Sequence, residues 1–125
     1  MRNRNEVVIL VVDDEDAITD ILKENFELEG FSVLVASSGN AAIEVLKKEK
    51  VDFVVSDVRM ANGDGIFLLK YIKTNCGDIP FIVLLSGYTE VLVEEVIKLG
   101  ALDLMSKPPN IEKIIEIINS YCECT

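Results

Sequence analysis

The most informative absence from this chain is histidine, of which its 125 residues include none. Without imidazole the chain cannot form a Ser-His-Asp triad, a histidine-ligated zinc site or a histidine general base. The three cysteines are an odd count without metal-ligand spacing, which predicts free thiols. We interpret the stretch Cys122-Glu123-Cys124 as a frayed tail. Any chemistry must therefore come from carboxylates, lysines and hydroxyls.

Long apolar runs and excess positive charge are also missing. Half of the residues are hydrophobic, yet no stretch approaches the roughly 18 apolar residues that span a membrane. The basic start leads into a strand-length run without a small-residue cleavage site, so we expect no signal peptide. A net charge of −10 repels nucleic-acid phosphates, which excludes direct nucleic-acid binding by this domain. The expectation is one cytoplasmic domain over residues 1–125, with no membrane contact.

Apolar runs of strand length alternate with helical patterns five times. The runs are rich in valine, isoleucine and leucine, which is typical of parallel strands buried on both faces. The predicted strands lie at about 7–12, 32–36, 52–56, 80–85 and 102–105. Right-handed crossovers between such strands predict an α/β fold, a doubly wound parallel sheet with helices on both faces. In these sheets ligands bind beyond the carboxyl ends of the strands.

Three aspartates stand where predicted strands end. Asp13 and Asp14 close the first apolar run, and Asp57 closes the third. Taken alone, the first pair suits a helix start, with Asp14 or Asp16 capping a helix at 17–28. With Asp57 at the same edge, the three carboxylates match a hard divalent cation such as Mg²⁺, which prefers oxygen ligands. The pattern therefore favours a metal site.

A lysine and a serine end two further strands. Lys107 follows the fifth strand, where it is either a solvated turn residue or a partner for Asp57 or for a phosphoryl group on Asp57. A cis bond between Lys107 and Pro108 would help to aim that side chain. Ser86 follows the fourth strand and is either a turn serine or a hydroxyl donor to phosphoryl oxygens. The stretch 62–65 predicts a tight turn in which Asp64 caps a helix at 65–74.

Five short stretches carry a family resemblance over essentially the whole chain. They are Val12-Asp13-Asp14-Glu15, the nine residues 57–65 (DVRMANGDG), Ser86-Gly87, Gly100-Ala101 and Lys107-Pro108. In this order and at these separations, the chain resembles the receiver domain of two-component response regulators, including chemotaxis regulators. The resemblance implies a flavodoxin-like, five-stranded parallel sheet with strand order 2-1-3-4-5.

The resemblance also implies a function and a set of site residues. Asp57 would accept a phosphoryl group from a sensor histidine kinase or a phosphotransfer protein. Mg²⁺ would be held by Asp13, Asp14, Asp57 and the backbone carbonyl of Arg59. Ser86 and Lys107 would contact the phosphoryl oxygens, and residues 88–121 would form the surface for a homodimer or an output partner.

Three positions depart from the usual pattern of that family. Ala61 stands where proline is common, which predicts a less rigid loop after Asp57. Leu104 occupies the place of an aromatic switch residue, so signal propagation cannot use a swinging hydroxyl. Arg59 and Tyr88 are both large and are expected at the rim of the site, where they either flank the phosphoryl group or are solvated loop side chains.

We therefore predict a phosphorylation-dependent signalling switch rather than an enzyme acting on other substrates. It would catalyse only its own phosphorylation and slow dephosphorylation. One alternative is a Mg²⁺-dependent aspartyl-phosphate phosphatase or transferase, although those families usually carry Asp-x-Asp after the first strand, unlike the adjacent Asp13-Asp14. A second alternative is a degenerate receiver that acts as a phosphorylation-independent interaction module, which Leu104 leaves open.

Overall fold

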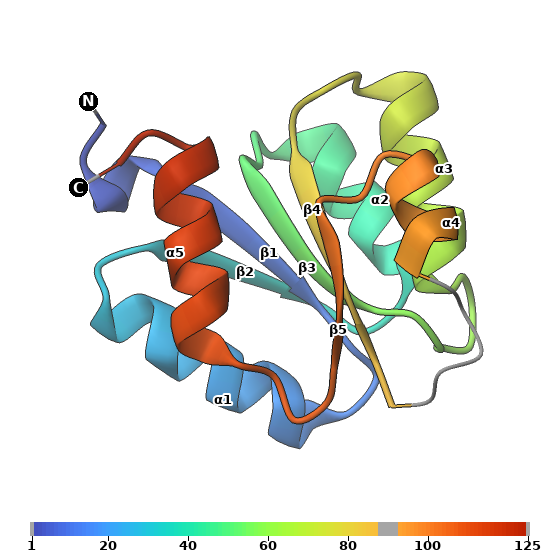
Figure 1. Ribbon diagram of the computed structural model, residues 1–125, viewed down its shortest axis with the longest axis horizontal. Coiled ribbons are helices and arrows are strands. Elements are labelled where there is room, and N and C mark those ends of the chain that lie inside the picture. Colours follow the sequence, from blue (N-terminus) through green and yellow to red (C-terminus); the bar gives the residue numbers. More distant parts are fainter. Residues whose placement is uncertain (1, 88–92, 125) are drawn as a thin grey trace.

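The computed structural model describes residues 2–87 and 93–124 and shows a five-stranded sheet between two layers of helices (Figure 1). All neighbouring strands are parallel, in the order β2-β1-β3-β4-β5, which confirms the predicted fold. The strands are β1 (Val8–Val12), β2 (Ser32–Ala36), β3 (Phe53–Asp57), β4 (Phe81–Ser86) and β5 (Asp103–Ser106). The helices are η1 (Arg4–Glu6), α1 (Asp16–Leu28), α2 (Gly39–Lys48), α3 (Gly65–Asn75), α4 (Val93–Lys98) and α5 (Ile111–Tyr121).

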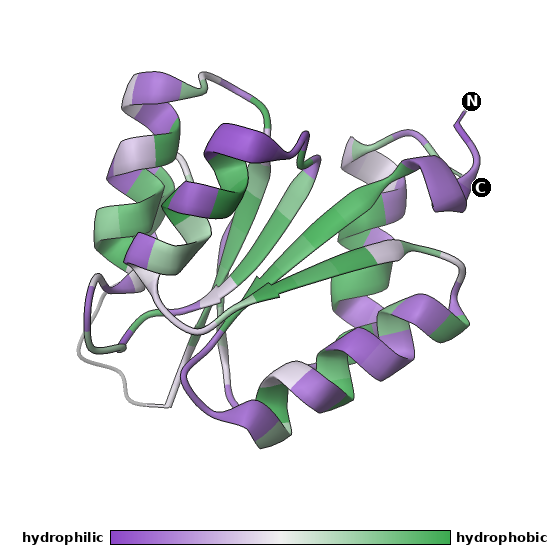
Figure 2. Cartoon of the chain, turned by 180° about the vertical axis from the view of Figure 1, so that it is seen from behind, coloured by the Kyte–Doolittle hydropathy of each residue, from purple (hydrophilic) through white to green (hydrophobic). Residues whose placement is uncertain are grey.

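The sheet separates two hydrophobic cores. Helices α1 and α5 cover one face, whereas α2, α3 and α4 cover the other (Figure 1). Successive side chains of a strand point to opposite faces, so Ile9 and Val11 enter the first core while Leu10 and Val12 enter the second. Figure 2 shows the consequence, with mostly apolar strands and helices that are hydrophilic on their outer sides. None of the helices in the described ranges is long and apolar enough to cross a membrane.

Side-chain caps fix where three of the helices begin. Ser38 Oγ accepts a hydrogen bond from the N–H of Ala41 at 3.0 Å and starts α2. Asp64 accepts from the N–H of Phe67 at 2.8 Å and starts α3, as the sequence predicted. Asn110 caps α5 in the same way. Each cap satisfies an N–H group that has no partner within its own helix, which is why short polar residues define these boundaries.

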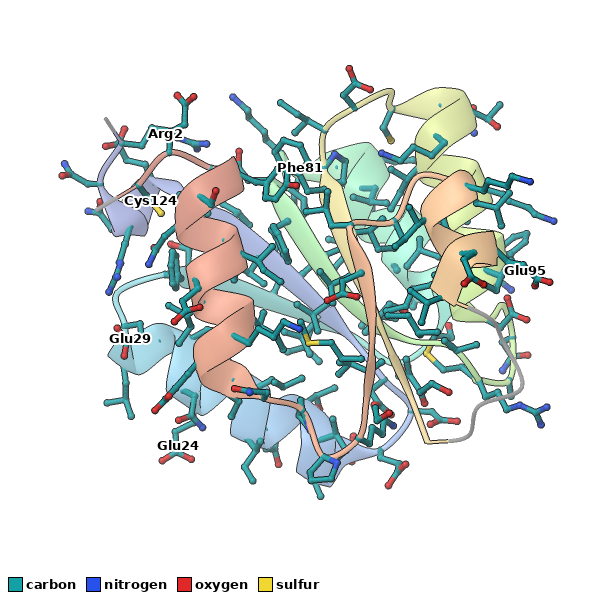
Figure 3. The ribbon with its side chains drawn as sticks, viewed as in Figure 1. Arg2, Glu24, Glu29, Phe81, Glu95 and Cys124 are labelled. Carbon is teal, nitrogen blue, oxygen red and sulfur yellow. The ribbon has the colours of Figure 1, made fainter. Side chains whose placement is uncertain are left out.

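The cysteine-containing tail is packed and not frayed, so that prediction is wrong for residues 122–124. Cys122 and Cys124 are both buried and belong to the core beneath α5. The tail runs beside the amino-terminal segment, where the N–H of Arg2 donates to the Glu123 carbonyl at 3.1 Å (Figure 3). Arg2 in turn pairs with the buried carboxylate of Asp52 at 3.1 Å. The tail is ordered because a distant segment supplies its hydrogen-bond partners.

This packing predicts unequal reactivity of the three free thiols. Cys76 is exposed, whereas burial raises the pKa of Cys122 to about 11 and also raises the pKa of Cys124. A rise of about two pKa units leaves roughly 100-fold less thiolate, the reactive form. In the native protein at pH 8 a thiol reagent should therefore modify one cysteine rapidly, and Cys76→Ser should abolish that fast phase. Three equivalent fast reactions in the native protein would show that the tail is open.

Candidate functional site

The three aspartates predicted to meet at one edge of the sheet do meet there. Asp13 and Asp14 follow β1, and Asp57 is the last residue of the neighbouring strand β3. One carboxylate oxygen from each residue lies within 4.8 Å of the other two. Asp13 and Asp57 are only 2% and 6% exposed, whereas Asp14 is exposed. Parallel neighbouring strands that end together therefore create a compact, partly buried acidic cluster.

The alternative role of the first acidic pair as a helix cap is wrong. The N-cap residue of α1 is Glu15, and no side-chain cap hydrogen bond is formed there. Asp13 instead turns back toward the site and accepts a hydrogen bond from the N–H of Glu15 at 3.0 Å. Neither Asp14 nor Asp16 occupies the capping position. Neither aspartate of the pair caps α1, and the second carboxylate oxygen of Asp13, Oδ2, faces Lys107.

Lys107 follows the edge strand β5 and reaches the acidic cluster at the same end of the sheet. Its Nζ lies 3.0 Å from Asp13 Oδ2, 3.2 Å from Asp57 Oδ2 and 3.6 Å from Glu15 Oε1. The side chain is only 16% exposed, so the interpretation of a solvated turn lysine is wrong. The bond between Lys107 and Pro108 is cis. Sequence reasoning anticipated the contact with Asp57 but assigned no role to Glu15, although Glu15 directly follows the aspartate pair.

Burial and neighbouring charges both shift the pKa values of the site residues. Burial and the nearby Asp13 raise the pKa of Asp57 above its ordinary value, and the ammonium of Lys107 offsets only part of this rise. Burial alone would lower the pKa of Lys107, but its hydrogen bonds to Asp13 and Asp57 outweigh that effect and raise its pKa. The lysine is therefore held as a cation, while Asp57 carries a negative charge that its surroundings only partly compensate.

A hollow of about 390 Å³ opens above Asp57 and Lys107. Ser86, at the end of β4, and the exposed Arg59 contribute to its wall. The backbone of Arg59 also hydrogen-bonds the Asp57 carboxylate, which favours the charged form. Tyr88, the second residue expected at the rim, lies outside the described residues. The structure thus places Ser86, Arg59 and Lys107 around one opening.

The loop between Asp57 and α3 is shaped by close backbone approaches. The positive φ angles of Asn62 (60°) and Gly63 (100°) form the predicted tight turn. The N–H of Gly65 donates to the Val58 carbonyl at 2.9 Å, and a Cβ atom at position 65 would overlap the Asp57 carbonyl. Glycine at 65 therefore lets α3 start directly against the end of β3. Sequence reasoning placed this glycine in a turn and did not foresee that approach.

The donor set suits a divalent cation. All the converging side-chain ligands are carboxylate oxygens, which hard cations prefer, and two of them are already shielded from water. The neighbouring hollow is lined by Asp57 together with Ser86 and the exposed Arg59. The cluster is thus able to bind a divalent metal and to place it beside a carboxylate facing an opening.

Comparisons with known proteins agree with this geometry. The model of the response regulator receiver domain family matches residues 9–119. Sporulation initiation phosphotransferase F of Bacillus subtilis is 33% identical over 114 residues, covering 90% of this chain and 91% of that protein. The Francisella response regulator 1452 receiver domain superposes with a TM-score of 0.85 and 28% identity, covering 94% of this chain and 97% of that one. The chain belongs to the response regulator receiver domain family of two-component systems.

Two further matches add context. A response regulator from Burkholderia pseudomallei, solved with a phosphorylated aspartic acid, a calcium ion and citrate, has a TM-score of 0.79 and 26% identity, covering 87% of this chain and 64% of that one. A putative NtrX-like response regulator of Rickettsia conorii is 31% identical over 123 residues. Those residues are 97% of this chain but only 26% of the relative. The chain thus spans about a quarter of that relative's length.

The raised pKa of Asp57 predicts a pH-dependent effect of Asp57→Asn on stability in metal-free protein. A carboxyl whose pKa is raised on folding contributes stability below its unfolded pKa of about 4, and this contribution is lost as pH rises through the folded pKa. The variant, which has no such charge, should therefore be more stable than the parent at pH 7, and the advantage should shrink toward pH 4. Chemical denaturation with a chelator present measures this.

The matched control for this prediction is Asp20→Asn. It makes the same chemical change at an exposed position of α1, away from the cluster. Its effect should stay within about 0.5 kcal/mol at both pH values, as is usual for surface substitutions. If Asp57→Asn destabilised the metal-free protein at pH 7, the account of uncompensated charge would be wrong.

Proposed function

We propose that Asp57 accepts a phosphoryl group from the phosphohistidine of a sensor histidine kinase or a phosphotransfer protein. The observation that carries this proposal is the position of the Asp57 carboxylate, at the end of the central strand β3 and at the floor of an open hollow. The ammonium of Lys107 lies 3.2 Å from it. Within the cluster, the carboxylate of Asp57 is buried, lies beside the ammonium of Lys107 and lines the hollow.

Phosphoryl transfer to Asp57 requires only positioning and charge compensation. A carboxylate oxygen of Asp57 attacks the phosphorus, the P–N bond to the imidazole breaks, and its electron pair remains on the imidazole nitrogen, which takes up a proton. Lys107 pairs with an oxygen of the incoming group, and the hydroxyl of Ser86 donates to another. Water later attacks the phosphorus of the acyl phosphate slowly, which releases inorganic phosphate and restores the Asp57 carboxylate. In this proposal the protein catalyses its own phosphorylation and its own slow dephosphorylation.

We propose Mg²⁺ as the cation, held by the carboxylates of Asp13, Asp14 and Asp57 and by the backbone carbonyl of Arg59. When bound, it supplies compensation for the negative charge of the transferring group. The oxygen-only donor set supports this assignment. The Burkholderia relative, whose structure holds a phosphorylated aspartic acid together with a calcium ion, supports a divalent cation beside the acceptor.

Asp57→Asn should abolish the phosphoryl mass increase that intact-mass analysis detects after incubation with acetyl phosphate and Mg²⁺. The amide is a poor nucleophile, while the surroundings of position 57 remain in place. Asp20→Asn serves as the control and should gain one phosphoryl group as the parent does. A full mass increase in Asp57→Asn would move the acceptor to another residue and overturn the proposal.

We further propose that residues 88–121 carry the signal to a second copy or an output partner. Support comes from three exposed apolar side chains on or beside α4, Val93, Ile97 and Leu99, which are 43%, 48% and 38% exposed. Leu104 on β5 is half-buried and packs against the core on the same side of the sheet. Because a leucine has no hydroxyl to reposition, its response is limited to repacking. Residues 88–92 of this surface lie outside the described ranges.

Hydrogen exchange with and without beryllium fluoride, a phosphoryl mimic, tests this output surface. We expect altered exchange across residues 87–105, because Ser86 moves toward the mimic and draws the following segment with it. The fifth strand should change only modestly, since Leu104 responds by repacking. Changes confined to α1 would place the output surface on the opposite face of the sheet.

A further inference from the structure

The amino end of α2 donates two backbone hydrogen bonds to the loop that follows Asp57. The N–H of Gly39 donates to the Gly63 carbonyl at 2.7 Å, and the N–H of Asn40 donates to the Asn62 carbonyl at 3.1 Å. These are two of the N–H groups that a helix start leaves without partners in its own backbone. Here they are satisfied by a loop that belongs to a different crossover of the sheet, between β3 and α3.

These two hydrogen bonds depend on the absence of a side chain at position 39. A Cβ atom there would lie 2.6 Å from the Gly63 carbonyl oxygen and 2.8 Å from its carbonyl carbon. Both are backbone atoms of a turn with two successive positive φ angles, Asn62 and Gly63, and cannot turn aside as a flexible side chain would. Any larger residue at 39 must therefore push the loop away from α2.

The turn at Asn62 and Gly63, which α2 holds, lies between two other fixed points of the same loop. Near its start, the N–H of Val58 donates to the Leu85 carbonyl at 2.9 Å. At its end, Asp64 caps α3 and Gly65 sits against the Asp57 carbonyl. Residues 59–61 join these points. They include Ala61, where the family resemblance leads us to expect proline. The contact with α2 thus supplies a restraint on a stretch that lacks the usual rigid residue.

We propose that Gly39 is a positioning residue for the metal site, because it allows α2 to hold the 58–65 loop from which the Arg59 carbonyl would reach the cation. The inference rests on the proposed function, since the Arg59 carbonyl is a metal ligand only in that proposal. Gly39 does not contact the cation. It acts through Asn62 and Gly63, three and four residues beyond Arg59, by fixing the direction in which the loop leaves the site.

Gly39→Ala tests the proposal by titration calorimetry with Mg²⁺ alone. Displacing the loop should weaken Mg²⁺ binding about tenfold, the usual scale for losing a residue that orients a metal ligand. In metal-free protein the amide hydrogens of residues 39 and 40 should also exchange faster than in the parent, because both lose their loop acceptors. Both measurements are made well below the melting temperature, so that a loss of global stability does not contribute.

Ser38→Ala is the matched control. It removes the side-chain cap from the N–H of Ala41 but leaves the two N–H groups that reach the loop. It should lower the melting temperature by a few degrees, as loss of a cap does, while Mg²⁺ binding stays within about twofold of the parent. A purely structural role of the α2 start would instead weaken Mg²⁺ binding in both variants to a similar extent.

A second variant, Asn40→Pro, keeps the proposal testable if Gly39→Ala does not fold. Proline is tolerated in the first turn of a helix and removes the N–H that reaches Asn62, while glycine remains at 39. It should also weaken Mg²⁺ binding. If the parent binds Mg²⁺ and both folded variants bind it equally well, the positioning role of Gly39 is wrong. If the parent does not bind Mg²⁺, the proposed metal site itself is wrong.

Discussion

Repulsion among carboxylates that the fold forces together is the constraint on which this structure depends. Asp13 and Asp57 are nearly buried at neighbouring strand ends, and Asp14 is close by. The ammonium of Lys107 is placed between the two buried groups, 3.0 Å from one and 3.2 Å from the other. It offsets part of the repulsion, and burial still keeps the pKa of Asp57 raised. The cluster thus retains an affinity for further positive charge.

That residual charge connects the architecture to the proposed switch. A bound cation would offset the negative charge that Lys107 leaves uncompensated. Once Asp57 carries a phosphoryl group, Lys107 would exchange carboxylate contacts for phosphoryl contacts. Ser86 lies at the end of the adjacent strand β4, from which the chain continues toward α4. In the proposed switch, a change of charge at Asp57 is passed through Ser86 toward α4, whose Val93 and Ile97 are exposed. In the same proposal, Leu104, which packs against the core, would limit the response of the fifth strand to repacking of apolar contacts.

Backbone contacts between crossovers also position the loop of this site. Gly65 brings α3 against the end of β3, and Gly39 brings α2 against the loop that joins them. In both places a side chain would collide with backbone atoms, so the position of the loop is set by the absence of a Cβ atom. The loop after Asp57 is accordingly fixed at its start, its middle and its end, although Ala61 gives it no rigidity of its own.

The five strands, their alternation with helices and the position of Asp57 and Lys107 at strand ends could be predicted from the sequence. These are local properties, because apolar runs, their periods and their last residues can be read along the chain. The contact between Lys107 and Asp13, 94 residues apart in the sequence, and the packing of the cysteine tail against Arg2 arise only in the folded protein. The same is true of the hydrogen bond between α2 and the loop at Gly63. Such contacts depend on how separate crossovers pack, and no local pattern specifies the distance between two side chains that only the folded sheet brings together.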